Sequence, residues 1–433
     1  MTAGSGTLSR STESSLGHSS SGPGSSGFER PGLGLPDDRQ PVIIAALRTP
    51  VCRANGALKH LRSHELLAPV LTALLAETGV DTGEVADVVI GNAVGAGGNV
   101  ARLAALEAGL PVTVPGLTVD RQCGSGLDAI VLASRLVAAG GGTYLAGGVE
   151  SISTAPLRAH RNDDGEPAFF SRVQFAPHSH GDPDMGVAAE NVAREYGISR
   201  ARQDEFALRS HRRAVAAQAG GTFARETVAL PAVSGTAPAP ETVPAKVTAD
   251  DGPRPKLSEA LMARFPAAFV ESGTVTAGNS CFDADGAAAV VITSLARARE
   301  LGAADGLAVL GTETAGVEPQ LLGIGAAAAA SRLLAAQSVE AANVDLVEFN
   351  EAFASQTLAC LDQLGIDSLR ANADGGALAL GHAYGASGAV LVTRLLAQAR
   401  QEPAAPAQGT LALAMISIAG GMGTAALFRH IRL

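Results

Sequence analysis

Residues 119–130 read VDRQCGSGLDAI and place Cys123 directly before a predicted apolar helix. The strand-like residues 143–148, TYLAGG, follow that helix. A thiol at the amino end of a helix is expected to have a lowered pKa, because the backbone dipole favours the thiolate. Gly124 and Gly126 let the backbone crowd the sulfur, so that amide N–H groups can face a developing oxyanion. The pattern therefore predicts that Cys123 is a nucleophile.

The same arrangement occurs a second time near the C-terminus. Residues 384–388, YGASG, open another apolar helix, and the strand-like residues 410–418 follow it and end in glycines. This repeated order predicts two similar halves that face each other. A chance likeness between two Ala/Gly-rich helices is the alternative interpretation. Apolar strands at residues 41–46 and 85–90 alternate with helical periodicity, which predicts an α/β layered fold.

The remaining segments divide the chain into a tail, two halves and an insertion. Residues 1–40 are rich in Ser, Gly and Pro and lack apolar periodicity, which predicts a disordered tail. The first half is expected over residues 41–290 and the second over residues 291–433. Within the first half, residues 154–283 hold a histidine-bearing loop, an amphipathic helix over residues 200–219 and a Pro-rich connection over residues 231–255. They are interpreted as a loop domain that could cover a site.

The composition is that of a globular protein with an aliphatic core. Hydrophobic residues make up 46% of the chain, charged residues 17% and aromatic residues 3%. The formal net charge of −10 argues against nucleic acid as the main partner, since phosphate binding needs a basic face. Residues 409–428 are uncharged and match the length of a membrane span. The AGGMG cluster at residues 419–423 divides them, so two buried strands joined by a tight turn are predicted and no membrane partner is expected.

The four cysteines show neither CxxC pairing nor metal-ligand spacing. No signal-peptide h-region is recognised, so a reducing, cytoplasmic setting with free thiols is expected. Cys52, Cys281 and Cys360 fit the surroundings of structural cysteines, in contrast to Cys123. No metal site is predicted.

Among the nine histidines, His382 is the predicted acid–base partner of a nucleophilic thiol. It lies in GGALALGHAYGASG, residues 375–388, where glycines on both sides leave a ligand room to approach. His160, His178 and His180 lie among polar residues and are predicted to be solvated. A metal site at the last two would lack a supporting ligand cluster.

Asn350 and Glu351 offer an amide and a carboxylate after the strand-like residues 344–349. Their position at the end of a strand is typical of site residues. The alternative is a helix N-cap followed by an acid in the first turn, which is a common structural pattern. Their spacing alone does not decide between the two.

Together these segments resemble the thiolases, which include acetyl-CoA acetyltransferases and 3-ketoacyl-CoA thiolases. The resemblance runs from about residue 41 to the C-terminus, and its six motifs occur in the family's order. They are VDRQCGSGLDAI at 119–130, GGVES at 147–151, MGVAAENVA at 185–193, GTVTAGN at 273–279, NEAFA at 350–354 and GH at 381–382. The resemblance implies two αβαβαββ halves that form a five-layered αβαβα sandwich, with an inserted loop domain that binds CoA.

The resemblance also implies roles for individual residues. Cys123 would carry the acyl group, and its backbone N–H would help form one oxyanion site, together with the turn at Ala419 and Gly420. His382 would activate the thiol and help bind a thioester oxygen, and Asn350 would hold a water there. The residues implied in CoA binding are Met185, Ala277 and Gly278 along the pantetheine tunnel, Cys281 beside it, and Arg254 at the CoA phosphate. CoA thioesters are implied as substrates, with no permanently bound cofactor.

The chain departs from the family at four positions. The family's CIGGGMG motif reads SIAGGMG here, so Ser417 replaces a cysteine that removes or returns a proton next to a thioester. A thiol titrates near ~8.5 and can act as a base, whereas an alcohol is a far weaker acid. Ala419 replaces a glycine whose N–H belongs to an oxyanion site. Cys281 and Ala383 replace a serine and a proline, which bears on affinity and loop rigidity.

Three functions follow from these observations. The first is a conventional thiolase, in which CoA or a second acyl-CoA resolves the acyl-enzyme. The second is an acyltransferase or decarboxylating condensing enzyme that needs no base at Ser417. The third is a catalytically reduced homologue that serves as a binding subunit. The resemblance implies a homodimer or homotetramer in each case.

Overall fold

The computed structural model describes residues 34–232, 245–401 and 409–433, which belong to one compact unit. Most of the predicted tail, residues 1–33, lies outside the described residues. The described chain is already ordered just before Pro41. Gln40 is buried, and its carbonyl accepts a hydrogen bond from the Leu295 N–H.

One mixed sheet of ten strands forms the frame of the fold. Its central strands β1 (Pro41–Arg48) and β11 (Asp305–Gly316) pair in antiparallel fashion and join the two halves of the chain. On the first side of this junction lie β10 (Ala284–Ser294), β5 (Thr143–Glu150), β3 (Val85–Gly91) and β4 (Gly116–Val119), with β2 (Cys52–Arg53) paired to β10. On the second side lie β14 (Met422–Arg432), β13 (Leu411–Ile418) and β12 (Leu346–Phe349).

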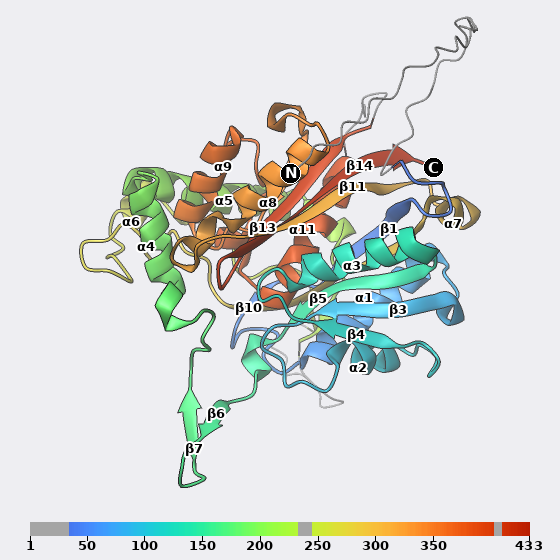
Figure 1. The fold of residues 1–433 in the computed structure, drawn as a ribbon, viewed down its shortest axis with the longest axis horizontal. Coiled ribbons are helices and arrows are strands. Elements are labelled where there is room, and N and C mark those ends of the chain that lie inside the picture. Colours follow the sequence, from blue (N-terminus) through green and yellow to red (C-terminus); the bar gives the residue numbers. More distant parts are fainter. Residues whose placement is uncertain (1–33, 233–244, 402–408) are drawn as a thin grey trace, which may run out of the picture. The chain divides into compact units, whose positions relative to one another are not determined.

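Helices cover both sides of this sheet and fill the space between its two halves (Figure 1). The central helices α3 (Ser125–Gly140) and α11 (Tyr384–Ala399) pack against each other and against strands of both halves. The outer helices of the first half are α1 (Ser63–Thr78) and α2 (Val100–Glu107), and those of the second half are α8 (Gly325–Ala336) and α9 (Ala354–Leu364). These layers confirm the predicted αβαβα sandwich.

The strand directions confirm the predicted internal repeat. In the first half, β3 runs parallel to β5, and β5 runs antiparallel to β10. In the second half, β12 runs parallel to β13, and β13 runs antiparallel to β14. In each half a central helix, α3 or α11, comes directly before the middle strand of these three. The two halves therefore have the same local topology, beyond a likeness of Ala- and Gly-rich helices.

Glycines bring the amino ends of the two central helices into close contact. A Cβ atom at Gly126 would lie 2.5 Å from the Gly385 carbonyl oxygen, and one at Gly388 would lie 2.5 Å from the Leu127 nitrogen. Side chains at these positions would push α3 and α11 apart. The residues just before the two helices, Cys123 and His382, are thereby directed to the same region.

Two apolar stretches have the length of a membrane span, and both have places in the fold. By length and composition only, residues 122–140 could cross a membrane. However, 56% of this apolar stretch is buried, because α3 lies between two sheet halves. Residues 411–432 form β13 and β14, as predicted, and the turn between them is at residues 419–421.

The loop domain contains helices and two short strands that form a hairpin. Its helices include α4 (Met185–Glu195), α5 (Arg200–Ala219) and α6 (Glu259–Met262), and α5 has the predicted bounds. The hairpin of β6 (Arg158–Arg161) and β7 (Pro167–Phe170) extends away from the layers (Figure 1). Further elements include α7 (Leu295–Glu300), α10 (Ala377–Leu380), the 3-10 helix η5 (Pro319–Ile324), and the strand pair β8 (Leu230–Pro231) and β9 (Lys246–Val247).

Candidate active site

A cavity of about 600 Å³, called the large cavity below, opens where the two halves and the loop domain meet. Its wall contains six of the residues predicted from the sequence, namely Cys123, His382, Ser417, Ala419, Met185 and Cys281. They come from both halves and from the loop domain. The fold thus brings the predicted nucleophile and the predicted acid–base partner to one cavity.

The turn before α3 presents Cys123 to this cavity. The Ser125 hydroxyl donates to the Gln122 carbonyl at 2.6 Å and accepts from the Arg121 N–H at 2.8 Å. Gln122 has a φ of 46°, in the left-handed region, and the Asp120 carboxylate accepts its N–H. These contacts hold the turn, and Cys123 lies on it as a half-buried residue.

Burial raises the pKa of the Cys123 thiol to about 12, so the prediction of a lowered pKa is wrong. The backbone N–H groups of Ala419 and of Cys123 itself favour the thiolate, but the loss of solvent outweighs them. The negative charges of Glu150 and Asp120 raise the pKa further. The resting group is a neutral thiol with two amides aimed at it, and α3 itself begins only at Ser125.

His382 is buried, with one nitrogen paired and the other free. Its Nδ1 forms a 2.6 Å hydrogen bond with the Ser387 hydroxyl, one turn into α11. Among the described residues, its Nε2 has no hydrogen-bond partner. Burial lowers the pKa of His382 to about 4, so the imidazole is neutral near pH 7. The ring packs edge to face on Tyr384, whose hydroxyl donates to Asp283.

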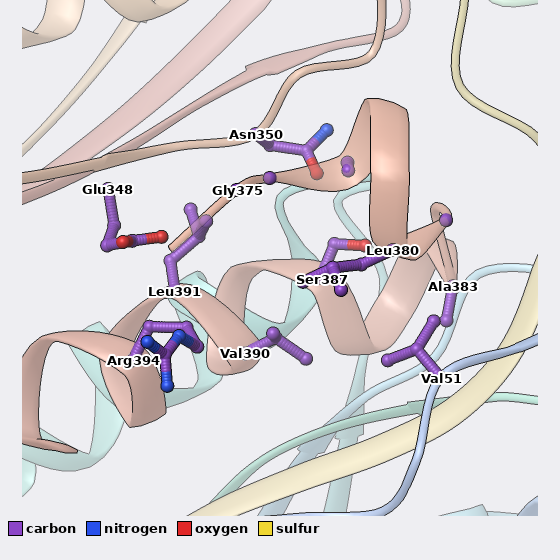
Figure 2. A pocket seen from close by; sticks show the side chains of 13 residues that line it. Val51, Glu348, Asn350, Gly375, Leu380, Ala383, Ser387, Val390, Leu391 and Arg394 are labelled. Carbon is purple, nitrogen blue, oxygen red and sulfur yellow. The ribbon is translucent and has the colours of Figure 1, made fainter. Parts of the chain in front are cut away.

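Asn350 lies at the end of β12 but lines a second, smaller cavity of about 20 Å³. Figure 2 shows Asn350 and Ser387 around this small cavity, with Glu348 and Arg394 toward one end. The Asn350 Nδ2 is buried and has no partner within the described chain. This small cavity has room for about one water molecule, and it contacts Ser387, the partner of His382.

The capping alternative for Asn350 and Glu351 is wrong. Helix α9 begins at Ala354, and its N-cap is Phe353. The Glu351 carboxylate is fully buried and accepts hydrogen bonds from the Ser210 hydroxyl and the side-chain amide of Asn372. Glu351 therefore joins the loop domain to the second half, while Asn350 carries the free amide.

Ser417 lies on the wall of the large cavity and is largely buried, and its hydroxyl both donates and accepts a hydrogen bond. The hydroxyl donates to the Gly323 carbonyl at 2.6 Å and accepts from the Ala326 N–H at 3.1 Å. The Cys360 thiol donates to the same Gly323 carbonyl at 3.3 Å. Ser417 consequently ties β13 to η5 and α8.

The turn after Ser417 places Ala419 on the cavity wall, with its N–H directed at the Cys123 sulfur. Gly420 has a φ of 83°, and a Cβ there would lie 3.0 Å from the Phe175 carbonyl oxygen. The glycine is therefore required at position 420, whereas Ala419 is accommodated with a buried methyl group.

The predicted CoA-binding residues fall into two groups. Met185, at the start of α4, and Cys281 lie on the wall of the large cavity. Arg254, Ala277 and Gly278 are not on that wall as the structure describes it. Arg254 is exposed, and its guanidinium donates to the Asp251 carbonyl.

Sequence reasoning did not identify the apolar wall of the large cavity or the partner of His382. The wall includes the aromatic residues Phe170, Phe175, Phe269, Phe353 and Tyr384. Most come from irregular loop segments, where no periodicity marks them. Ser387 could have been found, because it lies five residues after His382 in the same glycine-rich motif.

Metal binding finds no support in residues 34–232, 245–401 and 409–433, where no group of three or more His, Cys, Asp or Glu side chains could hold an ion. His178 and His180 are exposed, on a short 3-10 helix.

Comparisons with known proteins bear on the family of this chain. Residues 41–296 match the family model "Thiolase, N-terminal domain", and residues 306–430 match "Thiolase, C-terminal domain". A Staphylococcus epidermidis protein with the provisional name acetyl-CoA C-acetyltransferase VraB is 42% identical over 397 residues, which cover 90% of this chain and 99% of that protein. A Bacillus subtilis protein with the provisional name acetyl-CoA C-acetyltransferase YhfS is 42% identical, over 89% of this chain and 98% of its own length. The crystal structure of the Bacillus anthracis acetyl-CoA acetyltransferase superposes with a TM-score of 0.81 at 32% identity, over 91% of this chain and 99% of that one.

Proposed function

The chain belongs to the thiolase family, and we propose that its acyltransferase reaction proceeds through a thioester on Cys123. The observation that carries this proposal is the shared cavity, whose wall includes both Cys123 and His382, and the Nε2 of His382 has no hydrogen-bond partner among the described residues. A nucleophile and a base that can accept its proton are the minimum set for covalent acyl transfer.

In the first step, the Cys123 sulfur attacks the carbonyl carbon of an acyl-CoA while its proton passes to Nε2 of His382. The carbonyl oxygen gains negative charge, which the N–H groups of Cys123 and Ala419 stabilise, because both already point at the sulfur. The tetrahedral intermediate collapses and expels the CoA sulfur. Met185 and Cys281 would contact the pantetheine arm in this arrangement.

In the second step, CoA or a second acyl-CoA resolves the acyl-enzyme. Attack by CoA completes thiolysis of a 3-ketoacyl-CoA, and attack by the carbanion of a second acyl-CoA is the Claisen condensation of an acetyl-CoA C-acetyltransferase. The carbanion needs a proton acceptor. Ser417 does not offer one, because its hydroxyl is held between Gly323 and Ala326.

The hydrogen bonds that occupy the Ser417 hydroxyl favour a second candidate function. A donor that loses CO₂ generates its carbanion without a base, and His382, protonated in the first step, would then bind the enolate oxygen. Such a decarboxylating condensing enzyme would use malonyl-type donors.

Mass spectrometry of the protein incubated with acetyl-CoA tests the proposal. We expect one acetyl group on Cys123, and we expect Cys123→Ala to remove it. Cys52→Ala, which changes a buried thiol away from the cavity wall, is the matched control and should retain the adduct. A Cys123 that stays unmodified with a panel of acyl-CoAs would instead favour a binding subunit.

The same proposal includes the expectations about the setting of the enzyme. We propose a cytoplasmic homodimer or homotetramer that exchanges acyl-CoA and CoA with solution and keeps no permanent cofactor.

A further inference from the structure

A carbon–carbon step in the large cavity requires a proton acceptor other than Ser417. Asp283 is on the wall, but it is exposed and accepts the hydrogen bond of the Tyr384 hydroxyl. Burial and the nearby charge of Asp283 raise the pKa of the Tyr384 phenol, so Tyr384 stays a neutral donor. His382 is occupied by the proton of the nucleophile. Asp184, also on the wall, is exposed and forms an ion pair with Arg172. Among the possible proton acceptors on the wall as the structure describes it, the thiol of Cys281 remains.

The backbone fixes Cys281 between the two motifs that carry the chemistry. Its N–H donates to the Ala352 carbonyl at 3.0 Å, in the segment just after Asn350. The carbonyl of the next residue, Phe282, accepts the His382 N–H at 2.9 Å. Residues 281–284 therefore run beside His382, and Cys281 has a set position relative to the imidazole.

The two thiols are close enough to influence each other. A charge on Cys123 raises the pKa of Cys281, in addition to the larger effect of burial and that of Asp283. Both thiols also raise the pKa of Tyr384. Once Cys123 is acylated it can no longer ionise, so a thiolate at Cys281 meets no charge repulsion from Cys123 in the second step.

We propose that Cys281 is the second catalytic thiol, which protonates the departing CoA sulfur and then removes the α-proton of the second acyl-CoA. This inference rests on the proposed acyl-enzyme at Cys123. In this proposal, Cys281 performs the proton transfer that Ser417 cannot perform.

The protons and charges balance over the two steps. The Cys123 proton moves to His382, and the CoA thiolate takes the Cys281 proton, which leaves an imidazolium and a Cys281 thiolate. That thiolate takes the α-proton, and the carbanion attacks the carbonyl carbon of the Cys123 thioester. When the intermediate collapses, the Cys123 sulfur leaves as a thiolate and recovers its proton from His382.

Cys281→Ser is the sharpest test, because serine keeps a polar group of similar size and removes the titratable thiol. The measurement is deuterium uptake at the methyl group of acetyl-CoA in D₂O, with acetoacetyl-CoA thiolysis as a second assay. We expect both rates to fall by about 10²–10⁴-fold, the usual contribution of a positioned acid–base group. The acetyl adduct on Cys123 should still form, and Cys281→Ala should behave in the same way.

Cys360→Ser is the matched control, because Cys360 is a buried thiol behind Ser417 and is not on the described cavity wall. It should retain both rates. Unchanged deuterium uptake in Cys281→Ser, or an equal loss in Cys360→Ser, would overturn the assignment. So would a wild-type protein that acylates Cys123 without exchanging the methyl protons. A wild-type protein that never forms the adduct would contradict the proposed function itself.

Discussion

The turn before α3 and the turn before α11 use the same structural device for opposite chemical tasks. Each is a run of small residues that ends in an apolar helix, and each delivers one reactive side chain to the large cavity. Cys123 is half-buried there and receives two backbone N–H groups. His382 is buried, with one nitrogen bound to Ser387 and the other free.

This comparison shows that the internal repeat positions the two side chains. Their burial and hydrogen-bond partners then determine the chemical role of each. Burial raises the pKa of the thiol to about 12 and lowers that of the imidazole to about 4. Both shifts favour the uncharged form, so the resting pair of Cys123 and His382 is neutral. The charged pair forms only when a substrate carbonyl accepts electrons from the sulfur.

Removing the imidazole of His382 should have the largest effect on the reaction of Cys123. In His382→Ala, acylation of Cys123 by acetyl-CoA should slow by about 10²–10⁴-fold, because no base receives the thiol proton. Quenched mass spectrometry measures the rate. His178→Ala, at an exposed histidine, is the matched control and should acylate normally. A loss below tenfold in His382→Ala would show that the thiol finds another base.

The pH dependence of alkylation distinguishes the two turns without a mutation. Because the pKa of Cys123 is raised, its thiolate fraction should grow about tenfold per pH unit, or about 100-fold from pH 7 to pH 9. His382 contributes no step in this range, since its pKa is lowered to about 4. Iodoacetamide labelling, corrected with Cys123→Ala, measures the rate. A plateau reached near pH 8 would contradict the neutral resting pair.

The close contact between α3 and α11, which brings the two turns together, should contribute to the stability of the fold. In Gly126→Ala the new methyl group meets the Gly385 carbonyl oxygen, so the free energy of unfolding should fall by about 1–3 kcal/mol. Gly140→Ala, at the other end of α3, meets open space and should change stability little. Denaturant titration compares the two variants. Equal stability would mean that α3 and α11 adjust freely at their crossing.

The smallest expected effect concerns the Ser387 hydroxyl, which positions His382. In Ser387→Ala, kcat should fall about tenfold with KM unchanged, because the ring loses one hydrogen bond at Nδ1. Ser134→Ala, at a buried serine on α3 that donates to the Val131 carbonyl, is the control. An altered KM alone would indicate a role in substrate binding instead.

Local patterns in the sequence were sufficient for the frame of the fold and for the reactive pair. The repeat and an α/β layered fold follow from short segments, because a small-residue turn before an apolar helix is encoded by adjacent residues. The αβαβα layers were implied by the resemblance to the thiolases, which six motifs carry. Cys123 and His382 follow from the same segments. The bounds of α5 and the strand pair β13 and β14 were predicted for the same reason.

Only the tertiary structure decided the electrostatics and the contents of the cavity. The dipole argument gave the wrong direction for the Cys123 pKa, because desolvation depends on the packing of distant segments. The bound state of Ser417 depends on Gly323 and Ala326, and the place of Cys281 depends on Ala352 and the His382 segment. Sequence neighbours determine turns and helices, whereas proton affinity and access depend on groups that meet only after folding.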